Sequence, residues 1–124
     1  MKNQINTANA PGAIGPYSQA IDTGSMVFAS GQLPIDPATG AMPADITMQT
    51  RQSLTNVKAI LESAGLSMDN VVKTTVYLSD MADFTAMNAV YETFFQSPFP
   101  ARSAIAVKTL PKNALVEIEV IAVR

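Results

Sequence analysis

The spacing of apolar side chains along the chain predicts two amphipathic helices. Between Asp45 and Ala64, apolar or small residues recur every three or four positions, which places them on one side of a helix. Asp45 is a typical N-cap, and Gly65 follows the last turn where a C′ glycine belongs. A second periodic stretch runs from about Met81 to Phe95, with Asp80 as its cap. The expected inner faces consist of Ile46, Thr50, Leu54, Val57, Leu61 and Ala64 in the first helix and Phe84, Met87, Tyr91 and Phe94 in the second.

Runs of β-branched and alternating residues predict the strands that accompany these helices. A short strand opens the chain, and an irregular arm follows it up to residue 16. The later strands are expected over Tyr17 to Thr23, Met26 to Gln32, Val71 to Leu78, Ala101 to Val107 and Leu115 to Val123. We expect a hairpin through Gly24 and a final hairpin that turns near Lys112. The order β-β-β-α-β-α-β-β predicts an α+β fold of two layers, a sheet with both helices on one side.

The last predicted strand is apolar on both of its sides. The positions that alternate from Val116 to Ala122 suit a core beneath the helices, whereas Ile121 and Val123 share the other side with Glu117 and Glu119. A sheet has only one face under its own helices. An apolar far face therefore predicts contact with another subunit, and we expect an oligomer.

Composition limits the chemistry that this chain can perform. The 124 residues, 48% of them hydrophobic, form a single domain over residues 1–124. The sequence has no cysteine and no histidine. Disulfides, thiolate nucleophiles and Ser-His-Asp or Cys-His mechanisms are therefore excluded, and we expect no metal site.

The distribution of charge limits the partners. The formal net charge is −2, and no run of Lys or Arg could neutralise a row of phosphates, so nucleic-acid binding is not expected. The chain shows neither a signal peptide nor an apolar run near the roughly 18 residues of a spanning helix. We therefore expect no membrane association and a location in the cytoplasm.

One arginine stands out as a candidate ligand for an anion. Arg102 lies in an otherwise uncharged predicted strand directly after a proline-rich loop, and the small side chains of Ala104 and Ala106 leave room beside it. Its planar, permanently charged fork matches a carboxylate through two parallel hydrogen bonds. The alternative is a surface arginine that pairs with a nearby acid.

Glu117 is the candidate carboxylate. It lies in a predicted strand of nine residues, seven of which are apolar, so it must be paired, hydrated or neutral. It could orient or deprotonate an attacking water, or form a structural ion pair. In the predicted final hairpin it lies roughly 13 Å from Arg102, at about 3.3 Å per residue. The two groups would therefore meet one small ligand more easily across a subunit boundary.

Four further residues are weaker candidates for a binding site. Tyr17 opens a predicted strand and could offer its hydroxyl to a ligand, or fill the core. Asn88 lies at the edge of the apolar stripe of the second helix, where an inward amide needs partners. Ser30 and Gly31 end a predicted strand, and the glycine either lets the backbone approach a ligand or marks a bulge.

The sequence resembles the Rid/YjgF family over nearly its whole length, from Ala10 to Arg124. The most specific element is Pro100-Ala101-Arg102-Ser103-Ala104-Ile105, followed by Lys108, Leu110 and Val116-Glu117-Ile118. Supporting blocks are Ile14–Ala20, Ala29–Gln32, Asn56–Lys58, Val72–Val76 and Met87–Tyr91.

The resemblance implies a chorismate-mutase-like α+β fold, with the sheets of three subunits packed together in a homotrimer and clefts at the subunit boundaries. It implies hydrolysis of reactive enamines and imines of short 2-oxo acids to the oxo acid and ammonia, without metal or cofactor. Arg102 would grip the substrate carboxylate and Glu117 would handle the water. Tyr17, Ser30, Gly31, Asn88 and Ala104 would line the cleft. The substrates would come from PLP-dependent threonine or serine dehydratases.

One position departs from the family pattern. The archetypal deaminase branch has a cysteine two residues after the arginine, where this chain has Ala104. A role for the backbone at that position survives, but a thiol role does not. Two other functions stay open: a non-catalytic module that senses 2-oxo acids, and an RNA-cleaving inhibitor of translation, which the net charge and the absence of histidine oppose.

Overall fold

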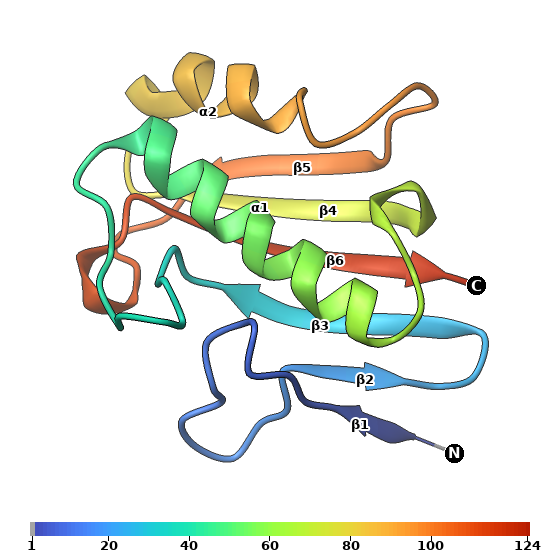
Figure 1. The fold of residues 1–124 in the computed structure, drawn as a ribbon. Coiled ribbons are helices and arrows are strands. Elements are labelled where there is room, and N and C mark those ends of the chain that lie inside the picture. Colours follow the sequence, from blue (N-terminus) through green and yellow to red (C-terminus); the bar gives the residue numbers. More distant parts are fainter. Residues whose placement is uncertain (1) are drawn as a thin grey trace.

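A computed structural model describes residues 2–124 as one mixed sheet with two helices on one face. Figure 1 shows both helices in front of the sheet, with α1 crossing its middle and α2 above β5. The predicted order β-β-β-α-β-α-β-β and the α+β fold are confirmed. The strands are β1 (Asn3–Ile5), β2 (Ala20–Asp22), β3 (Met26–Gln32), β4 (Val71–Leu78), β5 (Ala101–Ala106) and β6 (Val116–Val123), and the helices are α1 (Ile46–Ser63) and α2 (Phe84–Tyr91).

Helix α1 forms where the sequence predicts it. The side chain of Asp45 accepts a hydrogen bond from the backbone N–H of Met48 at 2.7 Å, which caps the first turn. Gly65 follows the last turn with φ of +78°, a conformation that glycine adopts without strain. Thr50, Leu54, Val57 and Leu61 are all buried against the sheet.

Two predicted elements are shorter than expected. The second strand begins at Ala20 rather than at Tyr17, because the residues before it belong to the irregular arm. The second helix starts as a short 3₁₀ turn over Met81–Asp83, capped by Asp80, and α2 itself ends at Tyr91 rather than at Phe95. Two further 3₁₀ turns lie at Met68–Asn70 and Pro111–Asn113.

The predicted final hairpin is wrong. The strand order is β1-β2-β3-β6-β4-β5, so β4 lies between β5 and β6. Strand β5 runs parallel to β4, to which α2 connects it, and the other neighbouring pairs are antiparallel. Burial explains this arrangement. The inner side of β6 is at most 2% exposed, as is common for a central strand with a neighbour on each edge, whereas β5 is the more exposed edge strand.

The sheet has a covered and an uncovered face. Val27 of β3, Val76 of β4 and Ile118 of β6 are fully buried on the face beneath the helices. The opposite face, which we call the far face, exposes 42% of Phe28 and 48% of Ile105. Within residues 2–124, no helix has the length and apolar character needed to cross a membrane.

Candidate active site

Arg102 is held on the covered face of the sheet. It lies directly beside the buried Thr74 of β4. Its Nη1 donates a hydrogen bond to Oδ1 of Asn88 on α2 at 2.6 Å. Its guanidinium carbon lies 4.7 Å from the ring centre of Tyr91 and 5.4 Å from that of Phe84, within the range of cation–π attraction. We call Phe84, Asn88, Tyr91 and Arg102 the arginine cluster.

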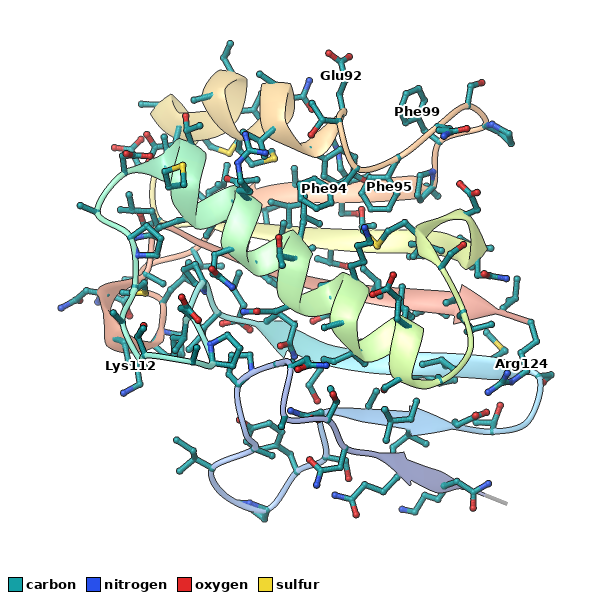
Figure 2. The ribbon with its side chains drawn as sticks, viewed as in Figure 1. Glu92, Phe94, Phe95, Phe99, Lys112 and Arg124 are labelled. Atoms are coloured by element: carbon teal, nitrogen blue, oxygen red, sulfur yellow. The ribbon has the colours of Figure 1, made fainter. Side chains whose placement is uncertain are left out.

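The positive charge of Arg102 has no acidic partner. The ion pair found within residues 2–124 joins Arg124 to Asp22, and no carboxylate lies within 4 Å of the Arg102 guanidinium. The interpretation of Arg102 as one half of a surface ion pair is therefore wrong. A pocket of about 390 Å³ lies beside the cluster, and Figure 2 shows Glu92 and Phe99 of its rim near each other beyond the end of α2. The pocket is lined by Asn88, Tyr91, Glu92, Phe99, Pro100 and Arg102.

Tyr91 forms a fixed platform for this guanidinium. Its hydroxyl and that of Thr74 are hydrogen-bonded at 2.8 Å, and its ring centre lies 4.7 Å from that of Phe95. Burial raises the pKa of the Tyr91 phenol, so the ring stays neutral beneath the arginine. Thr74 and Phe95 hold the Tyr91 ring in place, and the ring in turn holds Arg102 without neutralising its charge.

Glu117 lies on the far face, directly opposite Tyr77 of β4. The Glu117 carboxylate fits closely over Gly31 of β3: a Cβ added to that glycine would lie 2.0 Å from Oε2 of Glu117. Burial and, to a lesser degree, the neighbouring charge of Glu119 raise the pKa of Glu117. We call Gly31, Tyr77, Glu117 and Glu119 the glutamate cluster. The carboxylate therefore has the character of a strengthened base.

Gly31 also lies where the pairing of β3 with β6 changes register, between Ala29 and Gln32. Both interpretations of this glycine therefore hold in part. It belongs to a bulge, and its missing side chain leaves the space that Glu117 fills.

Ser30 and Tyr17 lie at the same end of the sheet as Gly31. The Ser30 hydroxyl donates to the backbone carbonyl of Ser18 at 2.7 Å, so its proton ties β3 to the arm. Tyr17 is 52% exposed, and its hydroxyl oxygen accepts a hydrogen bond from the N–H of Ile14 at 3.3 Å. Tyr17 and Gly31 both line a larger pocket of about 750 Å³ between the arm and the loop after β3.

The structure divides the predicted site residues into two groups. Arg102 lies beside Thr74 on the covered face, and Glu117 lies beside Tyr77 on the far face. Three residues along β4 and two strand spacings separate their backbones by about 14 Å. The separation of Arg102 and Glu117 predicted from a final hairpin was similar in size, but it assumed that their two strands pair directly, which they do not. Within one chain, the two groups cannot contact the same small molecule.

Ala104 lies on the same side of β5 as Arg102, opposite Val76, and packs partly buried against the core. It is not among the residues that line the pocket beside Arg102. Within residues 2–124, no three His, Cys, Asp or Glu side chains come together in an arrangement that could hold a metal ion.

Several members of both clusters were not predicted from the sequence. Phe84 and Tyr91 appeared there only as apolar-face residues, although their shared helical face already placed both rings on one side. The alternation of β6 places Glu119 on the same face as Glu117, which was the available signal for it. No sequence signal indicated Tyr77, because its contact with the two glutamates depends on the strand order.

Comparison with known proteins assigns the family. The family model described as Endoribonuclease L-PSP matches residues 7–124. The chain belongs to this family. Among Endoribonuclease L-PSP relatives, the 2-iminobutanoate/2-iminopropanoate deaminase of Salmonella typhimurium is 56% identical over 100% of this chain and 99% of that protein.

Solved structures of the Endoribonuclease L-PSP family share the fold. The crystal structure of Escherichia coli TdcF with bound serine has a TM-score of 0.96 and 53% identity, and the match covers 98% of each chain. The YjgF gene product of E. coli has a TM-score of 0.95 and 54% identity, again over 98% of each chain. The resemblance to the Rid/YjgF family is thereby confirmed.

Proposed function

We propose that this protein hydrolyses the reactive enamine and imine forms of short 2-oxo acids to the 2-oxo acid and ammonia. The substrates would be 2-aminoacrylate with 2-iminopropanoate, and 2-aminocrotonate with 2-iminobutanoate. The observation that carries the proposal is the unpaired guanidinium of Arg102, fixed beside a pocket. The name of the Salmonella relative and the serine bound to TdcF support a small ligand with a carboxylate.

The two clusters suit the two halves of this reaction. Arg102 binds the substrate carboxylate through its fork and so orients the imine carbon. Glu117 takes a proton from a water molecule whose oxygen bonds to that carbon. That proton passes to the imine nitrogen, which leaves one hydroxyl and one amino group on the carbon. The hydroxyl proton then moves to the amino nitrogen, the carbon–nitrogen bond breaks as the carbonyl forms, and ammonia leaves. The enamine form enters this path after it has tautomerised to the imine. The raised pKa of Glu117 strengthens it as the base for this step. None of these steps requires a metal or an organic cofactor.

The separation of the two clusters supports a site shared between subunits. Because Arg102 and Glu117 lie on opposite faces of one sheet, a complete site needs the arginine cluster of one copy and the glutamate cluster of another. The exposed apolar side chains of the far face supply a surface for such contact. We infer a homotrimer, as the family resemblance implies, with three such sites.

The substrate class identifies the enzymes that would supply it. PLP-dependent threonine and serine dehydratases release these enamines, so the protein would act directly after them. Its location in the cytoplasm stays a prediction.

A coupled assay tests this function. A threonine dehydratase generates the imine, and ammonia release is measured above the spontaneous rate with wild type and Arg102→Ala. Loss of two charge-assisted hydrogen bonds is expected to lower kcat/KM by about a hundredfold or more. Arg51→Ala is the matched control, because Arg51 is an exposed arginine on α1. Unchanged turnover in Arg102→Ala would refute the assignment.

The same samples separate the alternatives. The protein is a non-catalytic sensor if neither the wild type nor Arg102→Ala accelerates ammonia release, but calorimetry shows that the wild type binds a 2-oxo acid and Arg102→Ala does not. The family description names an endoribonuclease, so RNA cleavage is measured as well. We expect none above buffer, because the net charge is −2 and the chain has no histidine.

A further inference from the structure

Glu117 has two ionisable neighbours on the far face. Tyr77 lies directly opposite it on β4, and Glu119 follows it two residues along β6 on the same face. The Tyr77 hydroxyl donates a hydrogen bond to Oε1 of Glu119 at 3.0 Å. The tyrosine therefore lies beside one glutamate and donates a hydrogen bond to the other, on the face that both glutamates share.

No cation neutralises this pair of carboxylates within residues 2–124. Lys73 lies on the same face of β4, but its Nζ donates to Oγ of Ser103 on β5 at 3.3 Å, away from β6. Thr75 lies opposite Glu119, and the facing part of β3 presents Phe28, Ser30 and Gly31, none of which carries a charge. Within one chain, the two glutamates thus lie side by side on β6 without a compensating cation, about 7 Å apart along the strand.

The Glu117 carboxylate lies close to backbone on two sides. The backbone of Gly31 closes one side of the carboxylate and the strand of Tyr77 borders it on the other. The partial burial of Glu117 weakens solvent screening of the Glu119 charge. Burial and the charge of Glu119 both raise the pKa of Glu117, and burial has the larger effect. Burial, the hydrogen bond to Glu119 and the charges of both glutamates also raise the pKa of Tyr77, so its phenol remains a proton donor.

We propose that Glu119, anchored by the Tyr77 hydroxyl, is a positioning residue that holds a second negative charge beside Glu117 and so makes Glu117 a stronger base toward water. Glu119 itself touches no substrate. The catalytic consequence rests on the proposed deaminase function, whereas the electrostatic effect on Glu117 does not depend on it.

Titration of the Glu117 carboxyl by carbon NMR tests the electrostatic effect directly. Glu119→Gln keeps an acceptor for the Tyr77 hydroxyl but removes the charge, so the pKa of Glu117 should fall. Tyr77→Phe releases Glu119 and should lower it by less. Glu62→Gln, an exposed glutamate on α1, should leave it unchanged. An unchanged Glu117 pKa in Glu119→Gln would overturn the proposal, whether or not the protein is a deaminase.

The pH profile of the coupled assay tests the catalytic consequence. In Glu119→Gln the acid limb of kcat/KM should move to lower pH, and the plateau should fall about three- to tenfold as Glu117 becomes a weaker base. KM should stay within twofold, because Arg102 is untouched. A purely structural role for Glu119 would lower the thermal midpoint but leave the acid limb in place, and that result would refute the proposal. Tyr77→Phe gives the second test if Glu119→Gln does not fold.

Discussion

Two arginines of this chain show how local contacts decide the role of a charge. Arg124 pairs with Asp22, so its charge is compensated by the protein itself. Arg102 is held instead by an amide oxygen and two aromatic rings, which fix the guanidinium without cancelling its charge. A cation–π contact contributes about 0.5–2 kcal/mol, enough to orient the side chain. The unpaired guanidinium of Arg102 beside the pocket is what a small carboxylate would recognise.

A methyl group at position 31 tests the close fit between β3 and Glu117. In Gly31→Ala the new Cβ would lie 2.0 Å from the Glu117 carboxylate, so that side chain must move. We expect kcat/KM to fall at least about tenfold, with the free energy of unfolding lowered by less than about 1 kcal/mol, because a flexible side-chain end gives way. The coupled assay and urea unfolding measure the two quantities.

Gly12→Ala is the matched control, since a Cβ there meets nothing within 4 Å. If Gly31→Ala retained full activity, the close fit would have no bearing on the position of the base. The Glu117→Ala background provides a further check. There, adding Gly31→Ala should cost no additional activity.

At the scale of elements, a single buried glutamine attaches the N-terminal arm to the sheet. Gln19 is 2% exposed. Its amide oxygen accepts from the N–H of Thr7 at 2.7 Å, and its amide nitrogen donates to the carbonyls of Thr7, Ala10 and Pro11 at 2.8–3.3 Å. The arm leads to Tyr17 and forms one wall of the larger pocket. Its shape therefore depends on side-chain hydrogen bonds rather than on strand pairing.

Removal of this amide should loosen the arm. In Gln19→Ala the backbone groups that it satisfies lose their partners, and we expect the free energy of unfolding to fall by about 2–3 kcal/mol. Hydrogen exchange at the Thr7 amide should become faster by more than the global loss of stability explains. Gln4→Ala, at an exposed position on β1, should change neither quantity. Equal exchange of the Thr7 amide in Gln19→Ala and wild type would show that the arm is held by other contacts.

For the whole molecule, the two clusters on opposite faces of the sheet govern the expected behaviour. Each chain carries one arginine cluster and one glutamate cluster, which it cannot bring to the same ligand. A closed, symmetric assembly solves this, because every copy then lends one cluster to each of two sites. Light scattering of the wild type should give the mass of three chains.

Mixing two inactive variants tests the shared site. Arg102→Ala and Glu117→Gln are each expected to be inactive alone, but coexpressed chains should assemble at random. About a quarter of the sites then receive both native residues, and activity should return to about that fraction of wild type. As the control, the same two variants are purified separately, mixed and assayed before their subunits have time to exchange. A coexpressed sample without activity would show that both residues act within one chain.

The sequence alone determined most of the elements and the candidate residues of the site. Period and capping signals placed α1, β3 and β4 correctly, because these depend on local backbone preference and on one buried face. The absence of cysteine and histidine and an arginine in an uncharged strand narrowed the site to a few residues, among them Arg102 and Glu117. These conclusions needed no knowledge of which strands are neighbours.

Only the tertiary structure decided what those residues contact. The central place of β6 follows from competition among all strands for buried neighbours, which turn residues near Lys112 do not encode. The register of that sheet places Arg102 and Glu117 on opposite faces, and its strand order brings Tyr77 beside two glutamates. Strand pairing joins residues far apart in sequence, and a one-residue change of register reverses every face, so local pattern cannot fix it.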